Sequence, residues 1–493
     1  MIMMMRKMLR LITVSILLAA CSPSQPSGPS SSPTQATVIT ASSSPPEINP
    51  TKKTELIASA TSIFSELPLI PEPQAGKLRL AYVLEGNLWL LDEDREPVLL
   101  MESSDVEQVL LSPDGSQITI SRRRAADTVD LWAANSARWH KLSGEQRIGG
   151  NVQLISFSND GQLIAFFRHA DPGQEIWVAD VNSASARRLA GQETLQGAAG
   201  TLGVSFSQVE WIPNSHRLTY VPYNNPVGGD SGPPHDPLQI VDADTLEQSV
   251  LFPSGQGGYL TYSPNGKMMV VANEMQVRLL RVEDLSKPQT IATYLPICGT
   301  DCFIPQPAWS SDSAFFLLSL PSEQMNPDDF INGVEQPFII WEVSAETARM
   351  RRLGEFSVVP SVPGLFSFSP DLKRVAYTRG GDTRSLHIAD LDGSQDVSYT
   401  SAAEFMGWAP DSLHFAFRSD SGQLMDGDIL GDAIPLTDAA DAEFVGWLDA
   451  TRFLINVGPT GDWSLYLGTV RGESTRLVNF GASVLYDYVV IPG

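Results

Sequence analysis

A turn motif that recurs along the chain is the feature that most constrains its fold. Each copy has an aromatic residue or Leu, then Ser-Pro-Asp-Gly or a variant of it, and then a short apolar run. The copies begin at residues 111, 157, 211, 262, 309, 368, 408 and 447, so successive copies are 39 to 59 residues apart. Self-similarity at such a period predicts a repeat architecture in which each unit is one supersecondary structure.

The motif has a physical cause in turn chemistry. Pro presets φ for the second turn position, Asp or Asn can bond its own backbone, and Gly accepts a positive φ. In the second unit, β-rich runs follow the turn at residues 163–167 and 176–180, and an outer strand is marked by Arg187-Arg188-Leu189. Four short strands per unit, with no helical periodicity between them, predict an all-β fold, a β-propeller of four-stranded blades.

The number of blades is less tightly constrained by the sequence. Eight turn motifs are present, and Leu80–Val83 with Leu88–Asp92 has the pattern of the later strands of a further unit. Ser483–Val490 would supply the missing inner strand of that unit and close the ring, which removes an open sheet edge. A literal count gives nine blades. We favour eight, with one of the last two short units incomplete, and keep seven and nine as alternatives.

The repeats resemble those of a known family. The segment 157–166, which reads Phe-Ser-Asn-Asp-Gly-Gln-Leu-Ile-Ala-Phe, leads to Ile-Trp-Val-Ala-Asp at 176–180. This is similar to the WD40-like repeats of TolB-type propellers, over roughly residues 78–490. The resemblance implies the propeller fold and leaves the function open, because such repeats serve many roles.

The N-terminus has the organisation of an export signal. Arg6, Lys7 and Arg10 precede the apolar run 11–20, which is too short to span a bilayer as a stable helix. The run ends in Leu-Ala-Ala-Cys at 18–21, which resembles a bacterial lipobox. The resemblance implies a signal peptide at 1–20 and a lipid-modified Cys21. The alternative is an ordinary secretory signal in which Cys21 is incidental.

Composition divides the remaining chain into a tether and a domain. Residues 21–76 are dominated by Ser, Pro, Thr and Ala, which cannot bury enough apolar surface to fold, so we expect a disordered tether. The propeller is expected over 77–493. With Cys21 acylated, the protein would be anchored in a membrane of the bacterial cell envelope and face the extracytoplasmic side.

The other two cysteines, Cys298 and Cys302, are close together in sequence. Outside the cytoplasm such a pair favours a small disulfide loop, and a metal site is the weaker alternative. The net charge of −24 would become about −27 without the three basic signal residues. With this charge we expect no nucleic acid partner, since phosphate backbones would be repelled.

Long connections indicate where a ligand would bind. In a blade, the second-to-third and fourth-to-first connections lie on one face, and the insertions 190–207, 222–237, 292–307 and 320–337 all belong to these classes. Insertions that gather on one face of a repeat protein usually mark its binding surface. The candidate binding residues in these loops are Tyr223, Asp230, His235, Asp236, Phe303, Asp328, Asp329 and Phe330.

Motifs for catalysis and metal binding are weak. Gly-Asp-Ser-Gly-Pro at 229–233 echoes the nucleophile segment of trypsin-like proteases but lacks a recognisable partner-His motif upstream. Asp426-Gly427-Asp428 with Asp432 lacks the full ligand ladder of a calcium loop. We therefore expect no catalytic residues, metal or other cofactor, and a protein or glycan as the ligand. The alternative is a hydrolase or lyase with its site at the mouth of the propeller channel.

Overall fold

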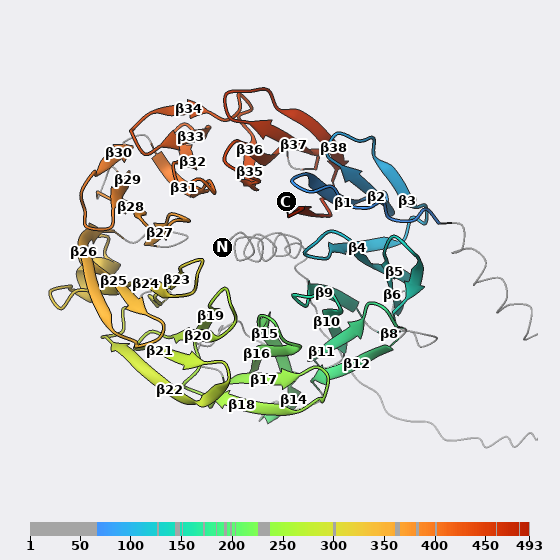
Figure 1. Ribbon diagram of the computed structural model, residues 1–493, viewed down its shortest axis with the longest axis horizontal. Coiled ribbons are helices and arrows are strands. Elements are labelled where there is room, and N and C mark those ends of the chain that lie inside the picture. The colour runs from blue at the N-terminus through green and yellow to red at the C-terminus, as the bar shows by residue number, and fades with distance from the viewer. Residues whose placement is uncertain are drawn as a thin grey trace, which may run out of the picture. The chain divides into compact units, whose positions relative to one another are not determined.

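The chain forms a ring of nine blades, each a four-stranded antiparallel sheet (Figure 1). The computed structural model describes residues 67–492, apart from 126–127, 143–147, 150, 171–172, 184, 192–194, 198–199, 203, 225–236, 299–301, 360–364, 381–383, 400–401, 460 and 483. The signal peptide with Cys21 and most of the predicted tether fall outside these residues.

The first three blades contain both ends of the described chain. Blade 1 consists of β39 (Tyr486–Val490), β1 (Leu78–Leu84), β2 (Asn87–Asp92) and β3 (Val98–Met101). Blade 2 consists of β4 (Val106–Leu111), β5 (Ile118–Ala125), β6 (Thr128–Ala134) and β7 (Trp139–Lys141), and β8 (Ile148–Gly149) also pairs with β6. Blade 3 consists of β9 (Asn151–Phe157), β10 (Leu163–Ala170), β11 (Gly173–Asp180) and β12 (Ser185–Ala190).

A small hairpin of β13 (Leu195–Gly197) and β14 (Gly200–Leu202) leads into the next three blades. Blade 4 consists of β15 (Val204–Trp211), β16 (Arg217–Asn224), β17 (Leu238–Asp242) and β18 (Gln248–Phe252). Blade 5 consists of β19 (Tyr259–Tyr262), β20 (Met268–Ala272), β21 (Gln276–Arg281) and β22 (Asp284–Thr293). Blade 6 consists of β23 (Ala308–Trp309), β24 (Phe315–Pro321), β25 (Gln336–Ser344) and β26 (Met350–Val358).

The last three blades complete the ring. Blade 7 consists of β27 (Phe366–Phe368), β28 (Arg374–Arg379), β29 (Ser385–Asp390) and β30 (Val397–Tyr399). Blade 8 consists of β31 (Ala402–Trp408), β32 (His414–Ser419), β33 (Leu424–Asp428) and β34 (Ala433–Pro435). Blade 9 consists of β35 (Ala442–Trp447), β36 (Arg452–Val457), β37 (Trp463–Thr469) and β38 (Thr475–Gly481). Both short units, blades 8 and 9, are complete, so the number is nine rather than the favoured eight.

The short helix α3 (Pro327–Ile331) lies in the connection between β24 and β25. Among the described residues, no helix has the length and apolar character needed to cross a membrane.

The predicted closure of the ring is confirmed. β39 is antiparallel to β1, with Leu80 opposite Tyr488, and it supplies the inner strand of blade 1. In Figure 1 the blue first blade therefore lies beside the red last one. The pairing leaves no inner edge exposed on β1, where another chain could otherwise add a strand.

A fully buried arginine ties the closing blade to its neighbour. The Arg79 Nε and Nη2 atoms donate to the two carboxylate oxygens of Asp92 at 2.6 and 2.9 Å, and Nη1 donates to the carbonyl of Gly115 in blade 2 at 2.8 Å. Nη2 also donates to the carbonyl of Pro71. Residues before β1 thus pack on the ring, where Ile70 is 2% exposed. Leu67 and Ile70, which composition placed in the tether, pack against the buried cluster of blades 1 and 2.

The turn motif works as its chemistry predicts. In blade 3 the hydroxyl of Ser158 donates to Asp160 at 2.6 Å and accepts the backbone N–H of Leu163 at 2.9 Å, while Gly161 has φ of +71°. The same serine-to-acid hydrogen bond occurs in the turns of blades 2, 6 and 7, and a serine-to-asparagine bond replaces it in blade 5. Each turn therefore satisfies its own polar groups and holds two strands in register.

The aromatic residue of the motif joins neighbouring blades. Where it is Trp, the indole Nε1–H donates to the inner strand of the preceding blade, as from Trp408 to the carbonyl of Ser367 at 3.0 Å and from Trp447 to that of Gly407 at 3.2 Å. The core lies between blades in the same way: Leu238 of blade 4 packs in one buried cluster with Met269 of blade 5. Each blade is thus stabilised by its neighbours, as in other repeat folds.

Strand order assigns each connection to one of two faces. The short motif turns join the first strand of a blade to the second. They lie on the same face as the connections from third to fourth strands, and we call this the tight-turn face. The other connections form the loop face. The four longest described or partly described connections, between β12 and β15, β16 and β17, β22 and β23, and β24 and β25, all belong to the loop face, as the sequence predicted.

Candidate functional site

The structure separates the candidate binding residues of the loop face into three groups. Asp230, His235 and Asp236 lie outside the described residues, and Tyr223 is within β16 with only its backbone described. Asp328 and Asp329 are exposed in the first turn of α3, where the Asp329 carboxylate accepts a hydrogen bond from Asn326 at 3.0 Å.

Two of the three aromatic candidates, Phe303 and Phe330, pack against Phe338. Phe330 is 5% exposed and its ring lies 5.3 Å from that of Phe338, which also contacts Phe303 at 5.2 Å between ring centroids. Burial of the Phe330 ring in this apolar cluster is favourable because it removes apolar surface from water. Phe330 is therefore buried below the loop face, whereas Phe303 is partly buried.

Cys298 and Cys302 form a disulfide across a β-bridge, at a Cα–Cα distance of 4.0 Å. The backbone N–H of Phe303 donates to the carbonyl of Ile297 at 2.8 Å, and Ile297 is 3% exposed. The base of the disulfide loop thus packs, through Ile297, in the buried cluster between blades 6 and 7.

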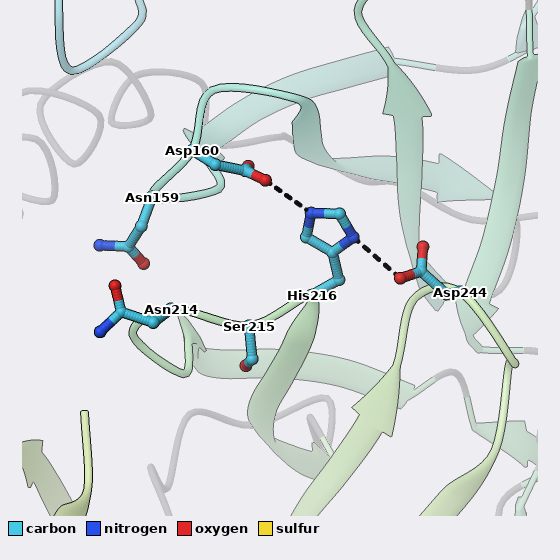
Figure 2. Close-up of a pocket in the computed structure, with 6 residues that line it drawn as sticks. All are labelled: Asn159, Asp160, Asn214, Ser215, His216 and Asp244. Atoms are coloured by element: carbon cyan, nitrogen blue, oxygen red, sulfur yellow. Dashed lines mark hydrogen bonds and ion pairs between the residues drawn. The ribbon is translucent and has the colours of Figure 1, made fainter.

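A polar pocket of about 410 Å³ lies between blades 3 and 4, on the tight-turn face (Figure 2). Its lining comes from three turns, namely β9–β10, β15–β16 and β17–β18. The lining residues are Asn159, Asp160, Asn214, Ser215, His216 and Asp244. The sequence did not point to this pocket, because the long insertions that indicated a binding surface all lie on the other face.

His216 is the central group of the pocket. Its Nε2 atom is 2.9 Å from Oδ2 of Asp160 in blade 3, and its Nδ1 atom is 2.8 Å from Oδ2 of Asp244 in blade 4. Figure 2 shows the ring held between the two carboxylates. Arg187 of blade 3 adds a second link, since its Nε donates to the carbonyl of Ala243 at 2.6 Å. The pair of blades is therefore joined by a histidine with an acid on each side.

The electrostatics of the pocket favour a charged imidazole. Burial alone lowers the pKa of His216, but the hydrogen bonds to Asp160 and Asp244 and their negative charges together raise that pKa above its ordinary value. The pKa of Asp160 is lowered, because burial, which acts in the opposite direction, is outweighed by hydrogen bonds from Ser158, Gln162 and His216. At mildly acidic pH the protonated His216 ring is therefore paired with both carboxylates, those of Asp160 and Asp244.

The local sequence explains why the β15–β16 turn, which contains His216, differs from the other motif turns. Ile212 replaces the serine of the motif, so the turn lacks its internal serine-to-acid hydrogen bond, and Asn214 adopts φ of +57°. Asn214 instead donates to the carbonyl of Asn265 in blade 5 at 3.2 Å. The degenerate motif at 211–215 is visible in the sequence, but the pocket that its turn helps to form depends on contacts with the neighbouring blade.

The side chains of the pocket are poorly placed for catalysis. The hydroxyl of Ser215 donates to the carbonyl of Ile212 at 2.9 Å and accepts the backbone N–H of Arg217, so it is engaged by backbone groups of its own turn. Both ring nitrogens of His216 face carboxylates, whereas a general base needs one nitrogen directed at a nucleophile. The amide side chains of Asn159 and Asn214, with these acids, offer hydrogen-bond donors and acceptors to a polar ligand.

The weak calcium motif has a structural explanation. Oδ1 of Asp428 accepts the backbone N–H groups of Leu430 at 2.8 Å and Asp432 at 3.0 Å, so this carboxylate closes the β33–β34 turn. Within the described part of the chain, no group of three or more His, Cys, Asp or Glu side chains is placed to hold a metal ion. Asp426 is 4% exposed, and its Oδ1 has no hydrogen-bond partner among the described residues.

Comparisons with known proteins support the fold. No family model matches the chain, and no curated protein matches it. Among solved structures, it is similar to "the eukaryotic initiation factor" at 12% identity and a TM-score of 0.50, over 84% of this chain and 99% of that chain. At this identity the similarity shows the fold alone.

Two further structures have lower TM-scores. Dihydro-heme d1 dehydrogenase NirN matches at 13% identity and a TM-score of 0.43, over 86% of this chain and 78% of that chain. TolB from Acinetobacter baumannii, of the family that the repeats resemble, matches at 14% identity and a TM-score of 0.23, over 68% of this chain and 65% of that chain. Scores this low add nothing on function.

We predict that His216→Ala lowers the free energy of unfolding by about 1–2 kcal/mol near pH 5.5, because two charge-assisted hydrogen bonds are lost at a partly exposed site. Because the pKa of His216 is raised in the folded state, protonation of its ring stabilises the folded chain. This stabilisation is fully present below the ordinary pKa of 6.5 and is lost as the pH rises through the raised pKa. Urea unfolding should therefore show a smaller difference between wild type and variant near pH 9. Asn214→Ala, in the same pocket, is the control and should have a pH-independent effect.

Asp426→Asn tests the buried carboxyl. Burial is the main cause that raises the pKa of Asp426 to about 6, with Asp411 and Asp428 adding to it and His414 and Arg471 opposing it. Because the folded pKa exceeds the ordinary value of 3.8, the carboxyl costs the native state stability as pH rises from about 4 through 6. The variant should be more stable by up to about 3 kcal/mol near pH 7.5 and equal to wild type near pH 4. Asp428→Asn is the control and should destabilise the chain, since it weakens two turn hydrogen bonds.

Proposed function

We propose that the protein is a lipid-anchored β-propeller on the extracytoplasmic side of the bacterial cell envelope, and that it binds a protein or glycan partner. The observation that carries this proposal is the gathering of all four longest connections on one face of a closed ring. A rigid scaffold with its long loops on one side is the usual arrangement of a binding module.

The proposed location follows from the N-terminal sequence and is supported by the disulfide. Basic residues, the apolar run 11–20 and the lipobox-like segment 18–21 together specify export and lipid attachment at Cys21. A disulfide between Cys298 and Cys302 is the state expected of an oxidising compartment outside the cytoplasm. The membrane would then be a partner through the lipid, and the propeller would face away from the cytoplasm.

The composition and the pocket chemistry favour binding over catalysis. A net charge of −24 disfavours nucleic acid as the ligand. The hydrolase or lyase alternative would need a histidine and carboxylates at the mouth of the channel. Asp160 and His216 lie in the turns that follow β9 of blade 3 and β15 of blade 4, and Asp244 follows β17, so the cluster joins the turns of two neighbouring blades. The ring nitrogens of His216 are also engaged by the two acids.

We predict that Cys21→Ala abolishes incorporation of an alkyne-palmitate label and moves the protein from the detergent phase to the aqueous phase after Triton X-114 partition. The reason is that acyl chains supply the anchoring free energy, about 0.8 kcal/mol for each buried methylene. Both readouts use the full chain expressed in a bacterium. Cys298→Ala with Cys302→Ala is the control and should keep the label. Unchanged labelling and partition of Cys21→Ala would refute the lipid anchor.

A further inference from the structure

We infer that the loop face of blades 5 and 6 is a docking surface for a cationic, apolar segment of a partner protein, one in which Lys or Arg alternates with Leu, Ile or Phe. This inference rests on the proposed function, since it names the site and the partner class of the binding module.

Exposed apolar side chains are concentrated on this face. Of the twelve large hydrophobic side chains that are exposed among the described residues, five lie on the loop face of these two adjacent blades. They form the docking surface: Tyr259 (52% exposed), Met275 (42%), Leu295 (75%), Ile331 (43%) and Val334 (51%). Single exposed apolar residues are ordinary, but a group of them on one face marks an interaction site.

Hydrogen bonds place Tyr259, Met275 and Leu295, the residues of the surface in blade 5, side by side. The side-chain amide of Asn273 donates to the carbonyl of Gly257, which brings the segment before Tyr259 next to the β20–β21 turn that contains Met275. The backbone N–H of Tyr294 donates to the carbonyl of Met275 at 2.9 Å, so Leu295 follows directly. The three side chains therefore cross blade 5 from its inner strand to its outer strand.

A row of aromatic rings, two of them buried and two partly buried, connects these residues with those of blade 6. The Tyr294 ring contacts Phe303 at 6.3 Å between centroids, Phe303 contacts Phe338 at 5.2 Å, and Phe338 contacts Phe330 at 5.3 Å. Leu295 follows the first ring of this row in sequence and Ile331 follows the last. The docking surface is thus carried by a single apolar layer.

The most exposed residue of the surface is held on a fixed loop. Leu295 lies between Tyr294, which is hydrogen-bonded to the β20–β21 turn, and Ile297, which is 3% exposed and next to the disulfide. An apolar side chain that a rigid segment keeps in water loses little conformational entropy when a partner covers it. This is the property of residues that contribute most to an interface.

Charge determines which partner fits. No Lys or Arg occurs from residue 288 to 348, a stretch that contains eight acids. Three of these acids, Glu323, Asp328 and Asp329, are exposed beside Ile331 and Val334 in the β24–β25 connection. Anionic lipid or a second copy of this acidic chain would be repelled, whereas Lys and Arg of a partner would be attracted. An apolar surface with an acidic rim therefore fits a segment that is both cationic and apolar.

The test selects peptides from a displayed random library on the immobilised full chain. Selected peptides should be enriched in Lys or Arg alternating with apolar residues. Their affinity, measured by fluorescence anisotropy, should fall when NaCl rises from 50 to 500 mM. Leu295→Ser with Val334→Ser should weaken binding about tenfold. The matched control, Leu413→Ser with Leu430→Ser, removes leucines exposed on the tight-turn face (45% and 80%) and should leave the affinity unchanged.

The outcomes separate the inference from the proposed function. Peptides that bind wild type and the Leu295/Val334 variant equally, or selected peptides that are acidic, would overturn the docking surface and leave a binding module in place. A dimer that the same variant abolishes would overturn it in favour of self-association. Retention of no peptide, and of no glycan from a glycan array, would count against the proposed function itself.

Discussion

The antiparallel pairing of β39 with β1 is the constraint on which the rest of the structure depends. Eight of the nine blades form from consecutive strands, but blade 1 is complete only when the last strand returns to the first. The closing strand also holds the next blade, since Asp487 accepts the backbone N–H of Leu111 at 2.8 Å. Without this pairing, two sheet edges would be open to water and to other chains.

Much of this fold could be predicted because it is specified locally. The turn of blade 3 is stabilised by Ser158, Asp160 and Gly161, three neighbours in sequence, and the same chemistry recurs in other blades. The aromatic residue of the motif joins neighbouring blades in the same recurrent way, as the hydrogen bond from the indole of Trp408 to Ser367 shows. The number of blades was harder to predict, since short units such as those beginning at 408 and 447 give no local indication of whether all four strands form.

The candidate site was less predictable, because its residues come together only in the assembled ring. Asp160, His216 and Asp244 belong to three turns of two blades, and nothing in the sequence near His216 indicates acids on both sides of it. Phe330 looked like a surface residue from its acidic neighbours, but Phe338, which buries it, lies on the following strand. The sequence does predict the face that carries the long connections, since that depends only on strand order. The two faces consequently differ in character, with a polar pocket on one and an acidic, apolar surface on the other.

The measurement that tests the ring closure most directly is a disulfide cross-link between β1 and β39 in the full chain. Leu80 lies opposite Tyr488, and opposed residues of antiparallel strands have Cβ atoms about 5 Å apart, close enough for a disulfide after a small adjustment. Leu80→Cys with Tyr488→Cys should form an intramolecular cross-link that mass spectrometry detects in a digest, whereas Leu80→Cys with Val490→Cys should link poorly. Absence of the first link, or a link only between separate molecules, would contradict a ring closed by its own two ends.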